Sequence, residues 1–134
     1  MTKVSEKELI NLIMLKLPKF IPYWETYINY WGTDEGIIMQ MLPFGKYAVD
    51  LLKSKHEKDI NLFFDFIEYL MCNGDKLVQA AITTGLLEHL LNNDPDEIQF
   101  ITFRQYLGYN TLEYCRAWDR FTGVFTKGLH DDEI

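Results

Sequence analysis

The sequence predicts an all-α fold, and three features of the chain support this class. Apolar residues recur three and four positions apart in most segments, which is the spacing of one face of an α-helix. The breaks between these segments are short and contain Gly, Pro, Asn or Asp. Several segments also begin with residues that commonly cap a helix. We therefore expect a single domain, residues 1–134, with about seven helices.

The clearest part of this pattern runs from Ile60 to Leu91. Two amphipathic segments flank the break Asn73-Gly74-Asp75, which is too short for anything but an antiparallel return. Gly74 is expected to end the first helix in a left-handed cap, and Asp75 to cap the second. Gly85 lies inside the second helix, where glycine costs about 1 kcal/mol relative to alanine, so we expect a close helix crossing there.

Shorter helices are expected in the part of the chain before this hairpin. Ser5 and Glu8 form a capping box at the start of the first helix, and Pro18 ends it. Pro22 fits the first turn of an aromatic-rich second helix. Its rings either fill a groove against the hairpin or stay partly exposed as a contact patch, because Tyr and Trp are favoured at binding hot spots. The residues in question are Tyr23, Trp24, Tyr27, Tyr30 and Trp31.

The type of residues 37–41 is ambiguous, because a short strand and a helical turn fit this segment equally well. Pro43 is expected to separate it from a helix over residues 44–53. Ser54 and Glu57 predict a second capping box, at the start of the central hairpin.

Two further helices are expected after the hairpin. Residues 94–97, Asp-Pro-Asp-Glu, predict the start of the first, and Gly108 its end. Residues 110–113 predict the start of the last helix, whose inward residues would be Leu112, Cys115, Trp118 and Phe121. The tail, residues 122–134, is expected to be loosely packed. Two successive hairpins, 56–92 and 94–121, suggest stacked helix pairs as in a HEAT-like solenoid, with an irregular helical bundle as the alternative.

Charge is distributed unevenly along the chain, whose net charge is −7. Residues 1–55 contain 7 Lys/Arg and 6 Asp/Glu, giving +1, whereas residues 56–134 contain 6 and 14, giving −8. An acidic body disfavours nucleic-acid binding, which needs basic patches, and suits a basic protein partner. It also suits a protein whose acidic surface serves only its solubility. No apolar run approaches the roughly 20 residues of a membrane span, and the amino terminus does not resemble a signal peptide.

No catalytic constellation is evident in the sequence. Asp65, Glu68, Glu88 and His89 could meet across the hairpin to hold a metal, but their positions beside apolar residues favour solvated helix edges. The glycines match neither phosphate-binding motif. The cysteines, Cys72 and Cys115, are expected to be reduced core thiols of a cytoplasmic protein. We therefore predict a protein that is not an enzyme and has no metal or cofactor.

Residues 62–123 resemble a family of small bacterial helical proteins. The matching segments are LFFDFIEYL, NGDKLVQAAITTGLLEHLLN, DPDE, YLGYNT and YCRAWDRF. Such proteins look like relatives of the immunity proteins encoded beside polymorphic or contact-dependent toxins. The resemblance implies a cytoplasmic protein that occludes the active surface of one cognate toxin, and the acidic balance suits a basic nuclease.

The alternative to an immunity protein is a helical adaptor that assembles as a homo-oligomer through its aromatic segment. On the immunity hypothesis, the acidic residues steer a basic toxin and the aromatic residues anchor it. The expected partner-binding residues are Glu88, Asp94, Asp96, Glu97, Tyr23, Trp24, Tyr27 and Tyr30.

Overall fold

The periodic segments form helices in the computed structural model, which describes residues 3–92 and 98–130 and contains no strand among them. The all-α prediction is confirmed. The first helices are α1 (Glu6–Lys16), α2 (Ile21–Trp31), α3 (Ile37–Gln40), α4 (Leu42–Ser54) and α5 (Glu57–Asn73). One continuous helix then combines α6 (Lys76–Ala80), a π-helical segment (Ala81–Leu87) and α7 (Glu88–Leu91), and the last helix is α8 (Tyr109–Thr122). Single 3-10 turns occur at Pro18–Phe20, Phe100–Thr102 and Arg104–Tyr106.

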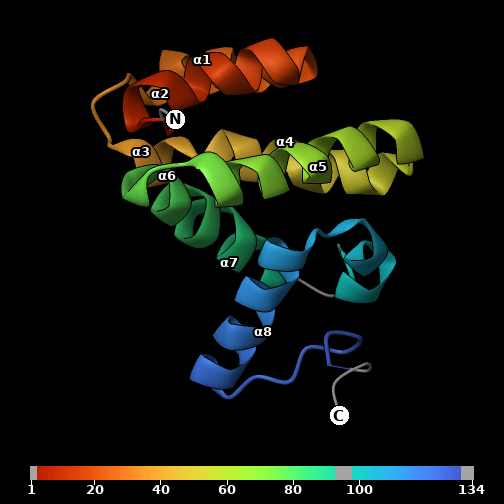
Figure 1. Cartoon of the computed structure of the whole chain (residues 1–134). Helices are drawn as coiled ribbons and strands as arrows, with labels where there is room; N and C mark the ends of the chain where they lie inside the picture. Colours follow the sequence, from red (N-terminus) through yellow and green to blue (C-terminus); the bar gives the residue numbers. More distant parts are fainter. Residues whose placement is uncertain (1–2, 93–97, 131–134) are drawn as a thin grey trace.

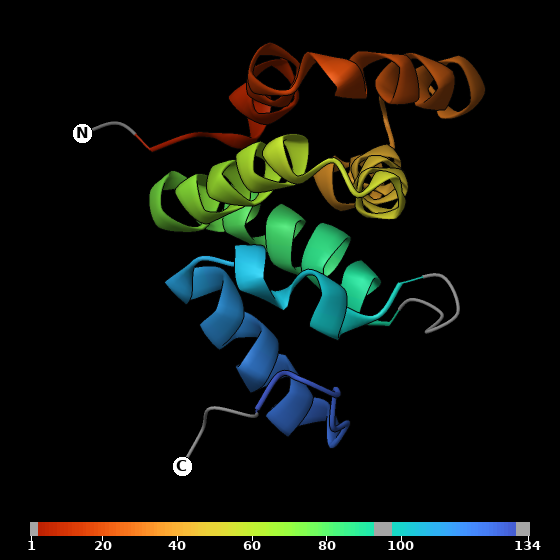
Figure 2. The same ribbon diagram turned by 90° about the vertical axis from the view of Figure 1, so that its right-hand side faces the viewer.

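The helices form successive layers. Figure 1 shows α1 and α2 at one end, α4 and α5 beneath them, then α6 to α7, and α8 at the opposite end. The turned view of Figure 2 shows the same order. The second predicted hairpin is not a regular helix pair, because residues 98–107 contain only 3-10 turns. The irregular arrangement, rather than a solenoid repeat, therefore describes this end of the molecule. The predicted helix start at residues 94–97 lies outside the described residues.

A line of aromatic rings holds the layers together. The rings of Phe20 and Phe44 meet edge to face at 5.3 Å, and Phe44 lies 5.1 Å from Phe63. Phe63 in turn contacts Phe64 at 4.9 Å, and Phe64 stacks on Phe103 at 5.8 Å. All five rings are buried. Edge-to-face and offset contacts of this kind add to the hydrophobic contribution of burial, so this line joins the start of α2 to the segment before α8.

The turn between α5 and α6 differs from its prediction at Gly74. This residue is extended, with φ −78° and ψ 150°, rather than left-handed. The position leaves no space for a side chain, because a Cβ there would collide with the side chain of Val78. The extended conformation lets Val4 pair beside it: the Val4 N–H donates to the Asn73 carbonyl at 2.8 Å, and the Asp75 N–H donates to the Val4 carbonyl at 2.8 Å. Asp75 caps α6 as predicted.

Capping explains two further boundaries. Glu8 accepts hydrogen bonds from the backbone N–H and hydroxyl of Ser5, as the first capping box predicts. The second predicted box is wrong: Ser54 is the last residue of α4, and its hydroxyl donates to the Leu51 carbonyl at 2.6 Å. α5 begins after His56 instead.

The ambiguous segment 37–41 is helical, since α3 covers its first four residues. Pro43 does not separate α4 from the preceding segment but lies in its first turn, where proline is tolerated. The expected close crossing at Gly85 is present. A Cβ on Gly85 would lie 2.7 Å from the Met41 Cβ and 3.2 Å from the Ile38 carbonyl oxygen.

α8 is attached to α5 through a carboxylate from outside its own segment. Glu68 accepts the backbone N–H groups of Asn110 and Thr111 at 3.0 and 2.9 Å, and both of their side chains at 2.8 Å. Burial alone would raise the pKa of Glu68, but these hydrogen bonds hold that pKa below its ordinary value. Gly108, the residue before the helix, supplies no side-chain cap, so Glu68 caps α8 across the layers.

The described part of the tail packs against α8 in places, whereas Val124 and Phe125 are 55% and 74% exposed. Asp119 is 1% exposed and accepts the N–H and hydroxyl of Thr126, each at 2.7 Å, while His130 Nε2 lies 3.1 Å from it. Leu129 is completely buried. The inward placement of Phe121 was wrong, because this ring is 84% exposed.

Candidate functional site

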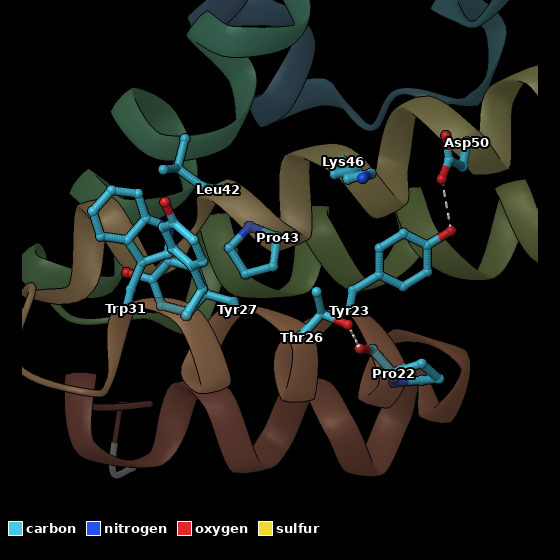
Figure 3. Close-up of a pocket in the computed structure, with 10 residues that line it drawn as sticks. Pro22, Tyr23, Thr26, Tyr27, Trp31, Leu42, Pro43, Lys46 and Asp50 are labelled. Carbon is cyan, nitrogen blue, oxygen red and sulfur yellow. Dashed lines mark hydrogen bonds between the residues drawn. The ribbon is translucent and has the colours of Figure 1, made fainter.

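A groove of about 590 Å³ lies between α2 and α4. Figure 3 shows its side chains, with Trp31 and Leu42 toward one end and Tyr23 and Asp50 toward the other. Both walls are helical, so the positions of the side chains follow from residue spacing on each helix. The lining residues are Pro22, Tyr23, Thr26, Tyr27, Tyr30, Trp31, Leu42, Pro43, Lys46 and Asp50.

The α2 wall contains three of the four predicted aromatic contact residues. Tyr23, Tyr27 and Tyr30 are three and four positions apart and therefore lie along one side of the helix. Trp24 does not line the groove. It is half-buried and stacks on Tyr27 with the ring centres 5.6 Å apart, so it supports the wall from behind. Phe20 lies 6.5 Å from Trp24 on the core side.

The α4 wall was missed by the sequence analysis. Leu42, Lys46 and Asp50 are four positions apart, so they form one exposed row along the helix. Part of the signal was available, because Lys46 and Asp50 lie one turn apart within the helix predicted over residues 44–53. It did not show that α2 would pack beside it, since that contact is tertiary.

The Tyr23 end of the groove is polar. The Tyr23 hydroxyl donates to the Asp50 carboxylate at 2.8 Å, as Figure 3 shows. This hydrogen bond, followed by burial, raises the pKa of Tyr23 to about 12, so the phenol stays a neutral donor near pH 7. Lys46 is exposed and forms no ion pair within the described chain.

The other end exposes aromatic surface. Tyr30 is 79% exposed, Trp31 is 50% exposed, and their rings meet edge to face at 4.9 Å. Tyr27 beside them is buried, and its hydroxyl has no hydrogen-bond partner in residues 3–92 and 98–130. Burial, together with the charge of Glu35, raises the pKa of Tyr27. The groove thus combines exposed rings, an unsatisfied buried donor and an unpaired cation.

One family covers most of this chain. Residues 10–123 match the family described as a domain of unknown function, DUF7674. The chain belongs to this family. The match contains the whole groove, the α5–α6 turn and α8 up to Gly123. No curated protein and no solved structure gives a significant match.

Glu88, one of the four predicted acidic contact residues, does not line the groove. Within the DUF7674 region, Glu88 accepts the Tyr114 hydroxyl at 2.6 Å and the Thr84 hydroxyl at 3.4 Å. Burial, followed by the hydrogen bond to Glu88, raises the pKa of Tyr114 to about 12. Glu88 therefore joins α7 to α8 inside the molecule. The other three acidic residues, Asp94, Asp96 and Glu97, lie outside the described residues.

The structure describes each of the candidate metal ligands and does not gather them into one cluster. Glu68 caps α8, Asp65 is exposed, and the His89 ring lies against Gly45. Among the described residues, no three His, Cys, Asp or Glu side chains are grouped to hold a metal ion.

The two cysteines differ in exposure. Cys72 is exposed, so its placement in the core was wrong, whereas Cys115 is buried as predicted. Burial, and then the charge of Asp119, raises the pKa of Cys115 to about 12.

In residues 3–92 and 98–130, every helix falls short of the length and hydropathy that a membrane span requires.

Proposed function

We propose that this protein binds a cognate bacterial toxin and neutralises it by occluding the toxin's active surface. The observation that carries the proposal is the aromatic groove between α2 and α4. Its outer rings, Tyr30 and Trp31, are exposed beside Leu42, which is 44% exposed. Exposed Tyr and Trp side chains are enriched among the residues that dominate binding energy. The resemblance of residues 62–123 to relatives of immunity proteins supplies the class of partner.

The charge distribution supports a basic toxin, such as a nuclease. Residues 56–134 have a formal charge of −8, and long-range attraction of this kind accelerates association with a basic protein. The groove lies in the other part of the chain, residues 1–55, which has a charge of +1. Steering and anchoring would therefore use residues from different parts of the sequence.

The test is to search the genes next to that of this protein for a toxin domain, to co-express the two proteins, and to measure cell survival and binding kinetics; the absence of any toxin gene there would count against the proposal. We expect protection, with Tyr30→Ala and Trp31→Ala each speeding dissociation by about tenfold or more. Tyr109→Ala is the matched control, because Tyr109 is 70% exposed on α8 and outside the groove. Survival that does not depend on this protein would reject the proposal.

A homo-oligomeric adaptor is the second candidate, and one observation favours it. Ile38 and Met39, on α3 near the groove residue Leu42, are 43% and 41% exposed. Apolar surface next to an aromatic groove also suits contact with a second copy of the chain. Light scattering over a concentration series separates the two functions: a dimer that Trp31→Ala dissociates supports the adaptor, and a monomer at all concentrations rejects it.

A further inference from the structure

We infer that the groove between α2 and α4 binds an extended peptide segment in which a large apolar residue and an Asp or Glu are two positions apart. This inference deepens the proposed function, because it names the chemistry of the segment that the toxin presents. The peptide chemistry itself is testable without any toxin.

The end of the groove near Trp31 and Leu42 indicates that the peptide presents an apolar side chain there. Both side chains are about half exposed there, and the neighbouring Tyr30 ring is more exposed still. A large aliphatic or aromatic side chain placed against them removes apolar surface of both partners from water. The volume of about 590 Å³ suits a few residues of peptide and is within the range of sites for drug-sized ligands.

Lys46 indicates that the peptide also presents a carboxylate. The groove contains two charged side chains, but Asp50 already accepts a hydrogen bond from Tyr23. Lys46 has no ion-pair partner in the described chain and is exposed at the groove. An acidic side chain of the peptide would therefore pair with Lys46.

The spacing of the two peptide residues follows from helix geometry. Leu42 and Lys46 are one turn apart on α4, which corresponds to about 6 Å along the axis. In an extended chain, residues i and i+2 are separated by about 6.6 Å, and their side chains point to the same side. A peptide aligned with α4, in either direction, thus places an apolar residue near Leu42 and a carboxylate two positions away near Lys46.

The Tyr27 hydroxyl favours an extended peptide over a helical one. Tyr27 lines the groove, and its hydroxyl is buried and has no acceptor in the described residues. The carbonyl groups of an extended peptide are not paired within the peptide, so one of them can accept from Tyr27. The carbonyls of a helix are already bonded within the helix, except at its end. An extended segment therefore satisfies a donor that a helix body would leave unpaired.

The experiment selects phage-displayed random peptides on the immobilised full chain. We expect enrichment of sequences with a large apolar residue two positions from Asp or Glu, on either side of it. Lys46→Glu, at an exposed position, should switch the selected charge to Lys or Arg at the same spacing. Lys76→Glu makes the same charge change at an exposed site outside the groove and should leave the selection unchanged. Selection of basic or charge-independent sequences, a selection that Lys46→Glu does not alter, or no enrichment at all would each overturn the inference.

A second measurement uses the synthetic peptide acetyl-Ala-Leu-Ala-Glu-Ala-amide, with a terminal fluorophore, in anisotropy titrations. Tyr27→Phe should weaken its binding by about three- to tenfold, the effect of one lost hydrogen bond. Tyr23→Phe should have little effect, because the Tyr23 hydroxyl is already bonded to Asp50. Equal effects of the two variants would contradict the role of Tyr27. Peptide selection without toxin neutralisation would reject only the proposed function, and neutralisation without the selected motif would reject only this inference.

Discussion

Between α2 and α4, aromatic rings line an open groove, whereas between α5 and α8 the carboxylate of Glu68 accepts hydrogen bonds from the same chain. In the groove, Tyr30 and Trp31 are exposed and the buried Tyr27 hydroxyl has no partner in the described residues. At the other contact, Glu68 accepts four hydrogen bonds from the start of α8. The groove therefore has exposed rings and an unsatisfied donor that a partner can contact, whereas the carboxylate of Glu68 is already hydrogen-bonded within the fold.

This difference changes how the acidic charge of the chain is interpreted. Glu68, Glu88 and Asp119 all belong to the acidic part of the sequence, and all three carboxylates accept internal hydrogen bonds. A count of charges therefore overstates the number of carboxylates available for direct partner contacts. These groups still contribute to the long-range field, which acts without contact. Steering by the acidic part and anchoring by the aromatic part remain compatible.

The largest expected effect is at the α5–α8 contact. Glu68→Ala leaves the first N–H groups of α8 and two side-chain donors without their acceptor. We expect a loss of about 2–4 kcal/mol in the free energy of unfolding, measured by urea denaturation. Asp65→Ala, one turn earlier on α5 and exposed, should change it by no more than about 0.5 kcal/mol. Similar losses in both variants would mean that Glu68 acts only through general charge.

The next effect concerns the packing of α3 against the π-helical segment. Gly85→Leu places a side chain where even a Cβ would lie 2.7 Å from the Met41 Cβ. We expect the free energy of unfolding to fall by about 1–3 kcal/mol through overpacking. An unchanged or raised urea midpoint would contradict this explanation, because leucine is otherwise a better helix former than glycine.

Local signals in the sequence predicted α1, α2, α5 and the helix from Lys76 to Leu91, but they also predicted a capping box at Ser54 and a helix running to Gly108 that the described residues do not contain. Tertiary contacts account for two other differences. The Ser5 box and the Asp75 cap are local, because donor and acceptor are within three residues of each other. The left-handed conformation predicted for Gly74 was wrong because the backbone there pairs with Val4, which is distant in the sequence. The cap from Glu68 was missed because it joins residues more than 40 positions apart.

The groove was predicted only in part for the same reason. Helical spacing identified the aromatic side of α2, including Tyr23, Tyr27 and Tyr30. Spacing on α4 also marks Lys46 as exposed, but no local signal shows that α4 packs beside α2. A wall formed by a neighbouring helix becomes visible only when the helices are placed in space.

A pH series separates the stabilising effect of the Glu68 charge from that of its hydrogen-bonding shape. Hydrogen bonds lower the pKa of Glu68 in the folded protein below its ordinary value of 4.5. Its charge therefore contributes stability in full above about pH 4.5, and this contribution is lost as the pH falls through the folded-state pKa. The difference in unfolding free energy between the wild type and Glu68→Gln should shrink from about pH 6 to about pH 3. A difference that stays constant across this range would contradict a role for the charge.

The smallest effects compare two tyrosines in the same groove. Tyr23→Phe removes a hydroxyl that donates to Asp50, so the free energy of unfolding should fall by about 0.5–1 kcal/mol. Tyr27→Phe removes a buried hydroxyl that has no partner in the described chain, so stability should stay the same or rise by up to about 1 kcal/mol. Each variant is the matched control for the other, because both lose one oxygen atom from the same type of ring on the same helix. Urea midpoints that fall equally in the two variants would show that the Tyr27 hydroxyl is satisfied within the protein, and the groove would then lose the donor that favours an extended peptide.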